Sequence, residues 1–308
     1  HALYDSERGV TKELKSQTAG AESTENRISS FNSNGFTLTG NTETNLSANN
    51  YVSWTFRKAP KFFDVVTYTG DGTSGRQINH DLGATPALLM VKATSATGDW
   101  NTIARISDTS YSFGLELNTT KVQSAATGPS STVSSTWFVP EYFTGSVSEM
   151  NASGTTYVAY LFADNTAEDV DDQMIKCGSF TTNSSGGATV NLGWQPQFLM
   201  FKIASGTADS WYMFDTMRDF TASKSSALFA NTSAPDASSN GNTKVTSNGF
   251  DISNQQNSVT YIYMAVRAPM MAEPDAATDV FAVDTRGSTG DGKEPGLRSG
   301  FPVDMALR

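Results

Sequence analysis

Residues that could perform acid–base or nucleophilic chemistry are few in this 308-residue chain. Two histidines are present, His1 and His80, whereas a hydrolase triad or a histidine-rich metal site needs a histidine beside further partners. His80 precedes Asp81, but this pair stands directly before a Leu-Gly step that is typical of a turn. The single cysteine, Cys177, follows Lys176 and has no histidine near it, so we expect a small buried side chain and not a nucleophile. The sequence therefore predicts no catalytic residue and no zinc site.

Two Thr-Gly-Asp-Gly loops could offer oxygen ligands to a calcium ion. They contain Asp71 and Asp291, and each loop supplies one carboxylate. Calcium takes about six to eight oxygen ligands, and the corresponding loop at 182–187 has no acidic residue. We therefore expect hairpin turns at these positions, with no metal ion and no cofactor.

Paired carboxylates are the other catalytic possibility, because two acids about 5–10 Å apart can hydrolyse a glycosidic bond. The chain has 31 aspartates and glutamates, but no acid pair recurs at a fixed spacing. We expect a protein that is not an enzyme, and a glycan depolymerase module is the alternative.

Three tryptophans are candidates for contact with a glycan. Trp100 and Trp211 each follow shortly after an aspartate, Asp99 and Asp209 respectively. An aromatic face beside a carboxylate can stack on a sugar ring while the polar group fixes its orientation. The same pattern also describes a core tryptophan, and both interpretations stay open. Among the other tryptophans, we expect Trp194 to be the most exposed.

Composition indicates which elements hold these residues. Hydrophobic residues make up 38 % of the chain and charged residues 17 %, and much of the remainder is Ser, Thr, Asn and Gly, which suits short strands joined by polar turns. The fold class is therefore all-β. The net charge of −10, without a basic stripe, disfavours nucleic-acid binding. No apolar run reaches the roughly 18 residues of a membrane span, so we expect no membrane insertion.

Self-similarity with a period of about 105 residues is the main feature of the sequence. A string with Gly and Pro followed by an apolar strand that ends on a cation occurs at 82–92, 192–202 and 300–308. A strand that begins with tyrosine occurs at 51–56, 157–162 and 261–266. This second strand is apolar on both faces at 157–162, which predicts a central strand covered by a second layer or by a neighbouring subunit.

The period divides the chain into four parts. They are the C-terminal half of a unit at 1–60, complete units at 61–172 and 173–274, and the start of a further unit at 275–308. Within the second part we expect strands near 62–69, 87–93, 101–106, 111–117, 136–140 and 156–163. Many short strands at this spacing are typical of a β-sandwich or jelly roll. In the first part, the segment from Asp5 to Leu14 predicts one short helix capped by Ser6. The three-residue spacing of Asp5 and Arg8, repeated at Asp215 and Arg218, predicts an ion pair or cap that fixes a turn.

The unit resembles the tandem repeats of large tail-fibre and other virion structural proteins from marine and environmental bacteriophages. The residues that carry the resemblance are 4–9, 35–38, 151–160 and the Gly-x-x-Pro strands. Such units are similar to concanavalin-like or SPRY-like sandwiches. The resemblance implies a location on the virion and an adhesive or scaffolding role, and it supplies no catalytic or ligand-binding residue.

Together these observations predict a non-enzymatic phage virion structural protein, either a tail fibre or a particle-surface array at the virion surface or outside the cell. We expect its partners to be other virion or filament subunits, copies of itself in a homo-oligomer, and host-surface glycan held weakly at many sites. A bacterial surface adhesin or extracellular filament subunit is an alternative.

Overall fold

The computed structural model describes residues 1–40, 43–107, 110–123, 127–129, 132–141, 148–166, 172–238 and 242–269. In these residues the chain is all-β, as the composition predicts, and the 3₁₀ turn whose bounds lie wholly within them is at Thr216–Arg218. None of the described helical segments is long and apolar enough to cross a membrane. The further unit expected at 275–308 lies outside the described residues.

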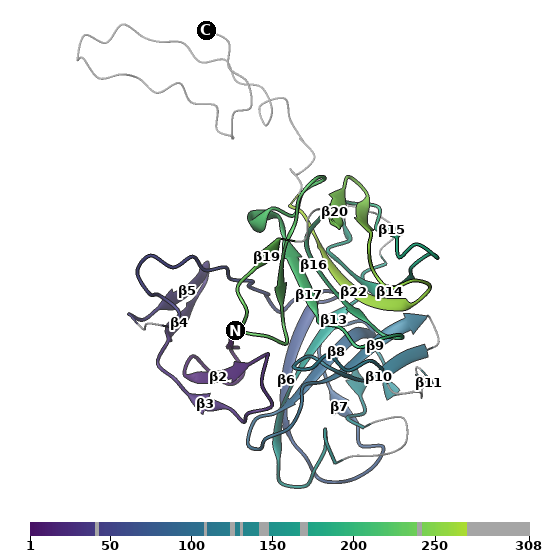
Figure 1. Ribbon diagram of the computed structural model, residues 1–308. Helices are drawn as coiled ribbons and strands as arrows, with labels where there is room; N and C mark the ends of the chain where they lie inside the picture. Colours follow the sequence, from purple (N-terminus) through teal and green to yellow (C-terminus); the bar gives the residue numbers. More distant parts are fainter. Residues whose placement is uncertain are drawn as a thin grey trace, which may run out of the picture. The chain divides into compact units, whose positions relative to one another are not determined.

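Two six-stranded antiparallel sheets dominate the structure (Figure 1). Sheet I has the order β11-β10-β9-β8-β13-β6 and sheet II the order β14-β22-β16-β17-β18-β19. The strands of sheet I are β6 (Phe63–Thr69), β8 (Pro86–Ala93), β9 (Asn101–Ser107), β10 (Ser110–Glu116), β11 (Thr127–Pro129) and β13 (Thr156–Ala163). Those of sheet II are β14 (Ile175–Thr181), β16 (Pro196–Ile203), β17 (Tyr212–Asp215), β18 (Ser226–Phe229), β19 (Ala237–Ser238) and β22 (Thr260–Arg267).

The order of strands follows the same rule in both sheets. In each sheet the last strand of the segment inserts between the first strand and the strand that begins with proline: β13 lies between β6 and β8, and β22 lies between β14 and β16. The expectation that residues 157–162 form a central strand is therefore confirmed. The remaining strands then follow in chain order away from the proline strand.

Smaller sheets pack against the large ones and give the sandwich-like layering. β7 (Ile78–Asn79) pairs with β12 (Trp137–Phe138), and β15 (Ala188–Asn191) pairs with β21 (Gly249–Ile252), which also pairs with β20 (Thr243–Thr246). Phe250 and Ile252 of β21 pack on Leu199 and Phe201 of β16 in one buried cluster. One face of sheet II is thus covered by its own segment of the chain.

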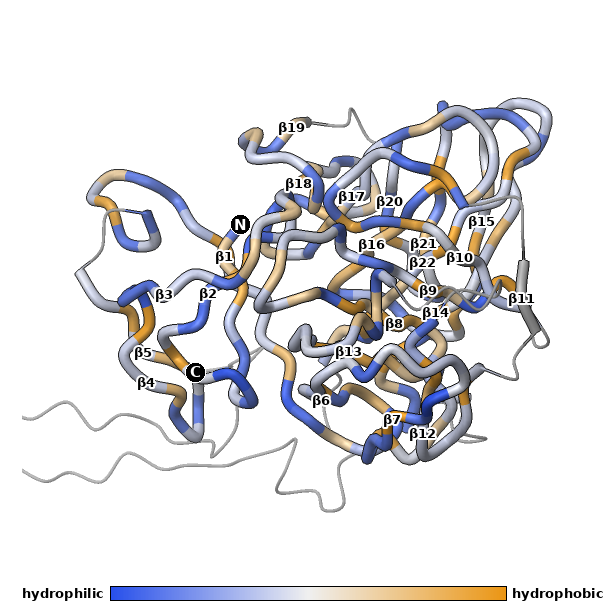
Figure 2. Tube along the Cα trace, turned by 90° about the horizontal axis from the view of Figure 1, so that it is seen from below, coloured by the Kyte–Doolittle hydropathy of each residue, from blue (hydrophilic) through white to orange (hydrophobic). Residues whose placement is uncertain are grey.

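The opposite face of sheet II belongs to a core that it shares with sheet I. Because successive side chains of a strand point to opposite faces, Phe198 and Met200 of β16 enter the cluster that also contains Leu88 and Tyr160 of sheet I. Figure 2 shows the hydrophobic stretches concentrated along β8, β13, β16 and β22. Residues 1–268 accordingly form one compact unit.

The N-terminal segment adds a three-stranded sheet and a hairpin. β1 (Ala2–Leu3), β2 (Lys12–Lys15) and β3 (Ser23–Thr24) form the sheet, and β4 (Ile28–Asn32) pairs with β5 (Gly35–Leu38). The short helix predicted from Asp5 to Leu14 is wrong, since this segment is a turn followed by β2. The turn forms because Asp5 accepts hydrogen bonds from the Arg8 backbone and guanidinium, and because Gly9 adopts a φ of +98° that a helix does not allow.

Candidate functional site

The tryptophans singled out by the sequence lie inside the protein. Trp100 and Trp211 are 0 % exposed and Trp194 is 3 % exposed. The expectation that Trp194 is the most exposed of the remaining tryptophans is wrong, because its ring is buried and its Nε1 donates a 3.3 Å hydrogen bond to Gln173 Oε1. None of the three rings offers a face to a glycan, so their burial favours the core interpretation.

Trp100 and Trp211 instead join separate segments of the chain. Trp100 Nε1 donates to the carbonyl of Lys15 at 3.0 Å, and Trp211 Nε1 donates to the carbonyl of Glu116 at 2.8 Å. His1 makes the corresponding contact, since its Nε2 lies 3.0 Å from the carbonyl of Phe229. The three carbonyls lie at equivalent positions. Lys15, Glu116 and Phe229 pair across their sheets with the residues that directly follow His1, Trp100 and Trp211, respectively.

Two buried lysines repeat this pattern. Lys92 Nζ donates to the carbonyls of Ala93 and Ala19, and Lys202 Nζ donates to those of Asp209 and Thr120. Both side chains belong to residues that are 0 % exposed. Burial lowers the pKa of each lysine to about 8, because the protein interior disfavours the charged form.

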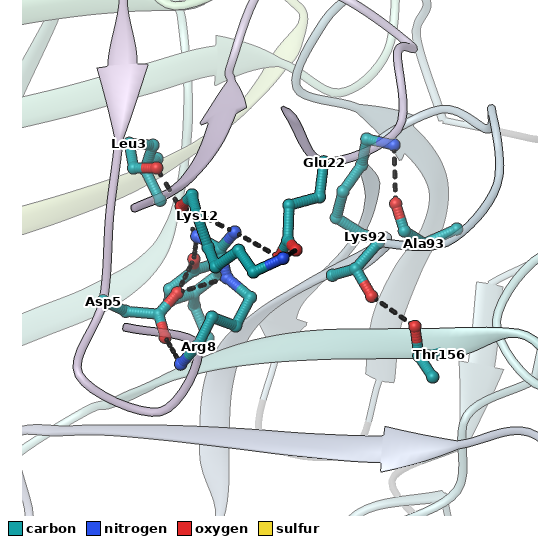
Figure 3. A network of polar contacts seen from close by, with 10 residues as sticks. Leu3, Asp5, Arg8, Lys12, Glu22, Lys92, Ala93 and Thr156 are labelled. Carbon is teal, nitrogen blue, oxygen red and sulfur yellow. Dashed lines mark hydrogen bonds and ion pairs between the residues drawn. The ribbon is translucent and has the colours of Figure 1, made fainter. Parts of the chain in front are cut away.

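Two ion-pair networks connect the segments further. Arg8 Nε donates to Asp5 Oδ2 at 2.6 Å, and Arg8 Nη1 donates to Glu22 at 3.0 Å (Figure 3). The Tyr160 hydroxyl also donates to Asp5 Oδ2, at 2.6 Å. The predicted pair of Asp5 and Arg8 is therefore confirmed, and its side chains are 6 % and 4 % exposed.

The second network repeats the first with different side chains. Arg218 Nε donates to Asp215 Oδ2 at 2.8 Å, and Trp54 Nε1 donates to the same oxygen at 3.1 Å. The Arg218 guanidinium also lies 5.6 Å from the centre of the Trp54 ring, within the range of a cation–π contact. Asp5 and Asp215 therefore each bind an arginine nearby in sequence and a side chain from a distant segment. These contacts give both arginines a structural role.

The remaining chemical candidates are also accounted for by local contacts. His80 is buried; its Nδ1 accepts the Leu82 N–H and its Nε2 lies 3.3 Å from the Ser134 carbonyl, while burial lowers its pKa. Burial raises the pKa of the Cys177 thiol well above its usual value, which disfavours the thiolate that a nucleophile requires. Asp71 accepts from the Thr73 N–H and from Asn151 Nδ2. Among the described residues no group of three or more His, Cys, Asp or Glu side chains could hold a metal ion.

A pocket of about 450 Å³ lies on sheet II and its covering loops, and we name it the amide pocket. Aromatic side chains of β17 and β18 form one part of its lining, amides and a hydroxyl form another, and Asp209 is the one carboxylate among its lining residues. The lining residues are Asp209, Tyr212, Phe214, Ala227, Phe229, Ala237, Asn242, Thr243, Asn254, Gln255 and Gln256.

Hydrogen bonds within the amide pocket orient part of this lining. Gln256 Oε1 accepts the Thr207 N–H and Gln256 Nε2 donates to the Thr207 carbonyl, both at 2.7 Å. Asn254 Nδ2 donates to Asn242 Oδ1 at 3.0 Å. The Tyr212 hydroxyl lies 3.2 and 3.3 Å from the two carboxylate oxygens of Asp209, and burial with this neighbouring charge raises the pKa of Tyr212. Half-buried aromatic rings beside fixed amides can bind a ligand with apolar ring faces and many hydroxyl groups.

Residues 1–269 match the protein family described as "Domain of unknown function (DUF7483)". The chain belongs to this family. No curated protein and no solved structure matches the sequence.

The amide pocket lies within the part of the chain that matches DUF7483. The sequence analysis identified Asp209, which lines the pocket, but expected Trp211 to be the aromatic residue that contacts a glycan. The Trp211 ring is buried, and the half-buried Tyr212 lines the pocket instead. Asn254 has a φ of +55° and stands in the polar run 253–258, a signal for a tight loop that could have drawn attention to this region.

Proposed function

We propose that this DUF7483 protein is a non-enzymatic structural protein of a bacteriophage virion, a tail fibre or particle-surface array that binds host-surface glycan. Its units are tandem β-sandwich repeats of about 105 residues, of the jelly-roll or concanavalin-like kind. The copies are residues 1–60, the second half of a unit, then the complete units 61–172 and 173–274.

The observation that carries the proposal is the identical strand order of sheet I and sheet II. Each sheet lies in one of the two complete copies, and each places its last strand between its first strand and its proline strand. Two unrelated segments are not expected to share a strand order in which the last strand is inserted, whereas two copies of one ancestral unit inherit it.

Contacts between the copies support a mechanical role. Trp100 of the second copy donates to the first, Trp211 of the third donates to the second, and His1 of the first contacts the third. In each contact, a ring nitrogen of one copy lies within hydrogen-bond distance of a strand carbonyl of another copy. Such interlocked contacts resist separation of the copies, which suits a protein that bears load on a particle surface.

The amide pocket supports glycan binding without hydrolysis. A sugar presents an apolar ring face to Tyr212 and Phe229 and its hydroxyl groups to Asn254, Gln255 and Asp209, all of which line the pocket. Hydrolysis usually requires two carboxylates, and the lining has one. The single acid therefore favours adhesion over a depolymerase.

Antibody labelling and electron microscopy test the virion location. Antibodies against this chain are expected to label the tails or capsids of phage particles in a preparation that contains the chain. Label on bacterial envelopes or filaments, with bare phage particles, would favour the surface adhesin or filament subunit instead.

A glycan array tests the amide pocket. Asn254→Gly removes the amide while allowing the same backbone, because glycine adopts the φ of +55° without strain. We expect at least a tenfold weaker apparent affinity for bound glycans. Ser258→Gly is the matched control, since Ser258 has a φ of +54° in the same loop and does not line the pocket. Equal binding by both variants, or loss of polysaccharide viscosity on mixing, would contradict adhesion at this site.

A further inference from the structure

The charge of the amide pocket limits which sugars it can bind. Asp209 is the one charged side chain among its lining residues, which include no lysine, arginine or histidine. The chain as a whole has a net charge of −10. Recognition of a carboxylate, sulfate or phosphate group on a ligand normally uses arginine or lysine. The pocket therefore disfavours acidic sugars and suits a ligand without negative charge.

Rings and methyl groups form the apolar part of the lining. Phe214 and Ala227 are each 1 % exposed, and Tyr212 and Phe229 are half-buried. The rings of Tyr212 and Phe229 meet edge to face, with their centres 5.2 Å apart. A methyl group of a ligand gains free energy when it leaves water for such a surface, whereas a hydroxyl group in the same place would lose its hydrogen bonds to water.

Two asparagines, Asn242 and Asn254, carry polar groups that are open to a ligand, and we name them the asparagine pair. Asn254 Nδ2 donates to Asn242 Oδ1 at 3.0 Å, and the Asn242 backbone carbonyl accepts the Ser253 N–H at 2.7 Å, which keeps the two side chains beside each other. Asn254 is exposed and Asn242 is half-buried, so a ligand can reach both amides.

The hydrogen bond within the asparagine pair leaves one acceptor and one donor. An asparagine amide has one carbonyl oxygen and two N–H groups. Asn254 Oδ1 therefore remains as an acceptor and Asn242 Nδ2 as a donor, and neither atom has another partner in the part of the chain that the structure describes. Rotation of both amides by 180° would again leave one acceptor and one donor.

Several other polar groups of the lining are occupied by contacts within the protein. Gln256 uses both amide atoms on the Thr207 backbone. The Tyr212 hydroxyl is directed at the carboxylate of Asp209. These contacts fix the shape of the pocket. Among the amides of the lining, the asparagine pair and Gln255 are left to bind a ligand.

We propose that the amide pocket binds the acetamido group of an N-acetylhexosamine, a neutral sugar, in host-surface glycan. An acetamido group has one N–H donor, one carbonyl acceptor and one methyl group. Its polar groups complement Asn254 Oδ1 and Asn242 Nδ2, and its methyl group is buried against the apolar lining. A plain hexose offers hydroxyl groups to the same amides but has no methyl group. The inference rests on the proposed glycan binding and names the class of sugar.

An array of matched sugars tests this preference in the unaltered full chain. Oligosaccharides of the glucose and galactose series are printed in three forms that differ at carbon 2, with an acetamido, a hydroxyl or an ammonium group. In at least one series we expect the acetamido form to bind at least tenfold more tightly than the other two, because a site that pairs with a polar group discriminates against analogues that lack it.

The other outcomes of this array separate the inference from the proposed function. Equal binding of the acetamido and hydroxyl forms would overturn the inference and leave glycan adhesion standing. Tightest binding of the ammonium form would assign recognition to the carboxylate of Asp209 and would also overturn the inference. Failure of both acetamido forms to bind would overturn it as well, and failure of every glycan on a broad array would overturn the proposed function too.

Salt dependence gives a second test with the unaltered chain. A neutral acetamido sugar forms no ion pair, so its affinity should stay within about twofold between roughly 0.05 M and 0.5 M sodium chloride, a range over which interactions between exposed charges are strongly screened. Isothermal titration calorimetry with the acetamido trisaccharide measures this affinity. A tenfold or larger loss of affinity in high salt would show that charge carries the recognition and would overturn the inference.

Asn242→Asp tests the donor directly. The variant keeps an oxygen for Asn254 Nδ2 but replaces the N–H group that we assign to the acetamido carbonyl, so we expect at least tenfold weaker binding of the acetamido form. Asn257→Asp is the matched control, because it adds the same charge at an exposed residue of the nearby loop that does not line the pocket. No loss in Asn242→Asp, or an equal loss in both variants, would overturn the assignment of this donor.

Discussion

At the scale of single residues, the indole N–H groups of Trp100 and Trp211 donate to backbone carbonyls of other segments and do not contact a ligand. Trp211→Phe would leave the Glu116 carbonyl without its 2.8 Å donor in a buried place and would open a small cavity. We expect the free energy of unfolding to fall by about 2–4 kcal/mol, measured by chemical denaturation. Trp137→Phe, at a half-buried ring, is the control and is expected to cost under about 1 kcal/mol. Equal losses of unfolding free energy in the two variants would show that the hydrogen bond between segments adds no stability beyond that of a half-buried tryptophan.

The buried lysines give a residue-scale prediction about pH. Lys92 and Lys202 have a pKa of about 8 in the folded chain and an ordinary value near 10.5 when unfolded. Between these values the unfolded chain binds more protons than the folded chain, so stability rises as pH rises through this window. Each lysine should contribute about 1 kcal/mol between pH 8 and 9. Above pH 9, Cys177 opposes this trend because its pKa is raised by burial.

Lys202→Met isolates the contribution of one lysine to this trend. We subtract the unfolding free energy of the variant from that of the unaltered chain. This difference is expected to rise as the pH increases from 8 to 9, because only the unaltered chain has the lysine at residue 202. Denaturant titrations at several pH values measure it. A difference that stays constant with pH would contradict a lowered lysine pKa.

At the scale of the elements, the loop that closes sheet II depends on one close approach of two backbones. Gly186 has a φ of +73°, and a Cβ there would lie 2.0 Å from the Gln255 carbonyl oxygen. Gly75 has the same φ, but a Cβ there would meet nothing within 4 Å. We expect Gly186→Ala to cost about 3 kcal/mol or more and Gly75→Ala about 1 kcal/mol, measured by thermal or chemical unfolding. Similar losses of unfolding free energy in the two variants would show that the positive φ, and not the close approach of two backbones, is what requires glycine at residue 186.

The elements also show what a sequence of this kind can predict. Strands expected near 62–69, 87–93 and 156–163 appear within a residue of those bounds, because apolar runs between turn signals depend on local pattern alone. The segment from Asp5 to Leu14 was misassigned because acid and base three residues apart suit both a helix and a tight turn. The amide pocket could not be predicted, since it combines β17, β18, β20 and a loop at 253–256 that only the folded chain brings together.

At the scale of the whole molecule, the shared core predicts how residues 1–268 unfold. Repeat arrays often behave as a sum of units that contact only their neighbours. Here Leu14 of β2, Leu88 of β8 and Met200 of β16, from three different sheets, belong to one buried cluster. Loss of packing in one sheet therefore exposes apolar surface of the others, so residues 1–268 should unfold in a single cooperative transition.

Hydrogen exchange of a Trp100→Phe variant measures this coupling directly. Trp100 directly precedes β9 of sheet I, and its ring contacts Tyr160 and the Lys15 carbonyl. If the two large sheets unfold together, the slowest amides of sheet II should lose the same stability as those of sheet I, about 2–3 kcal/mol. A loss confined to sheet I would mean that each large sheet opens by itself, and that the contacts between segments position the sheets without coupling their stability. Coupled loss is the behaviour expected if, as proposed, the protein is a surface array that must keep all of its repeats folded while it bears load.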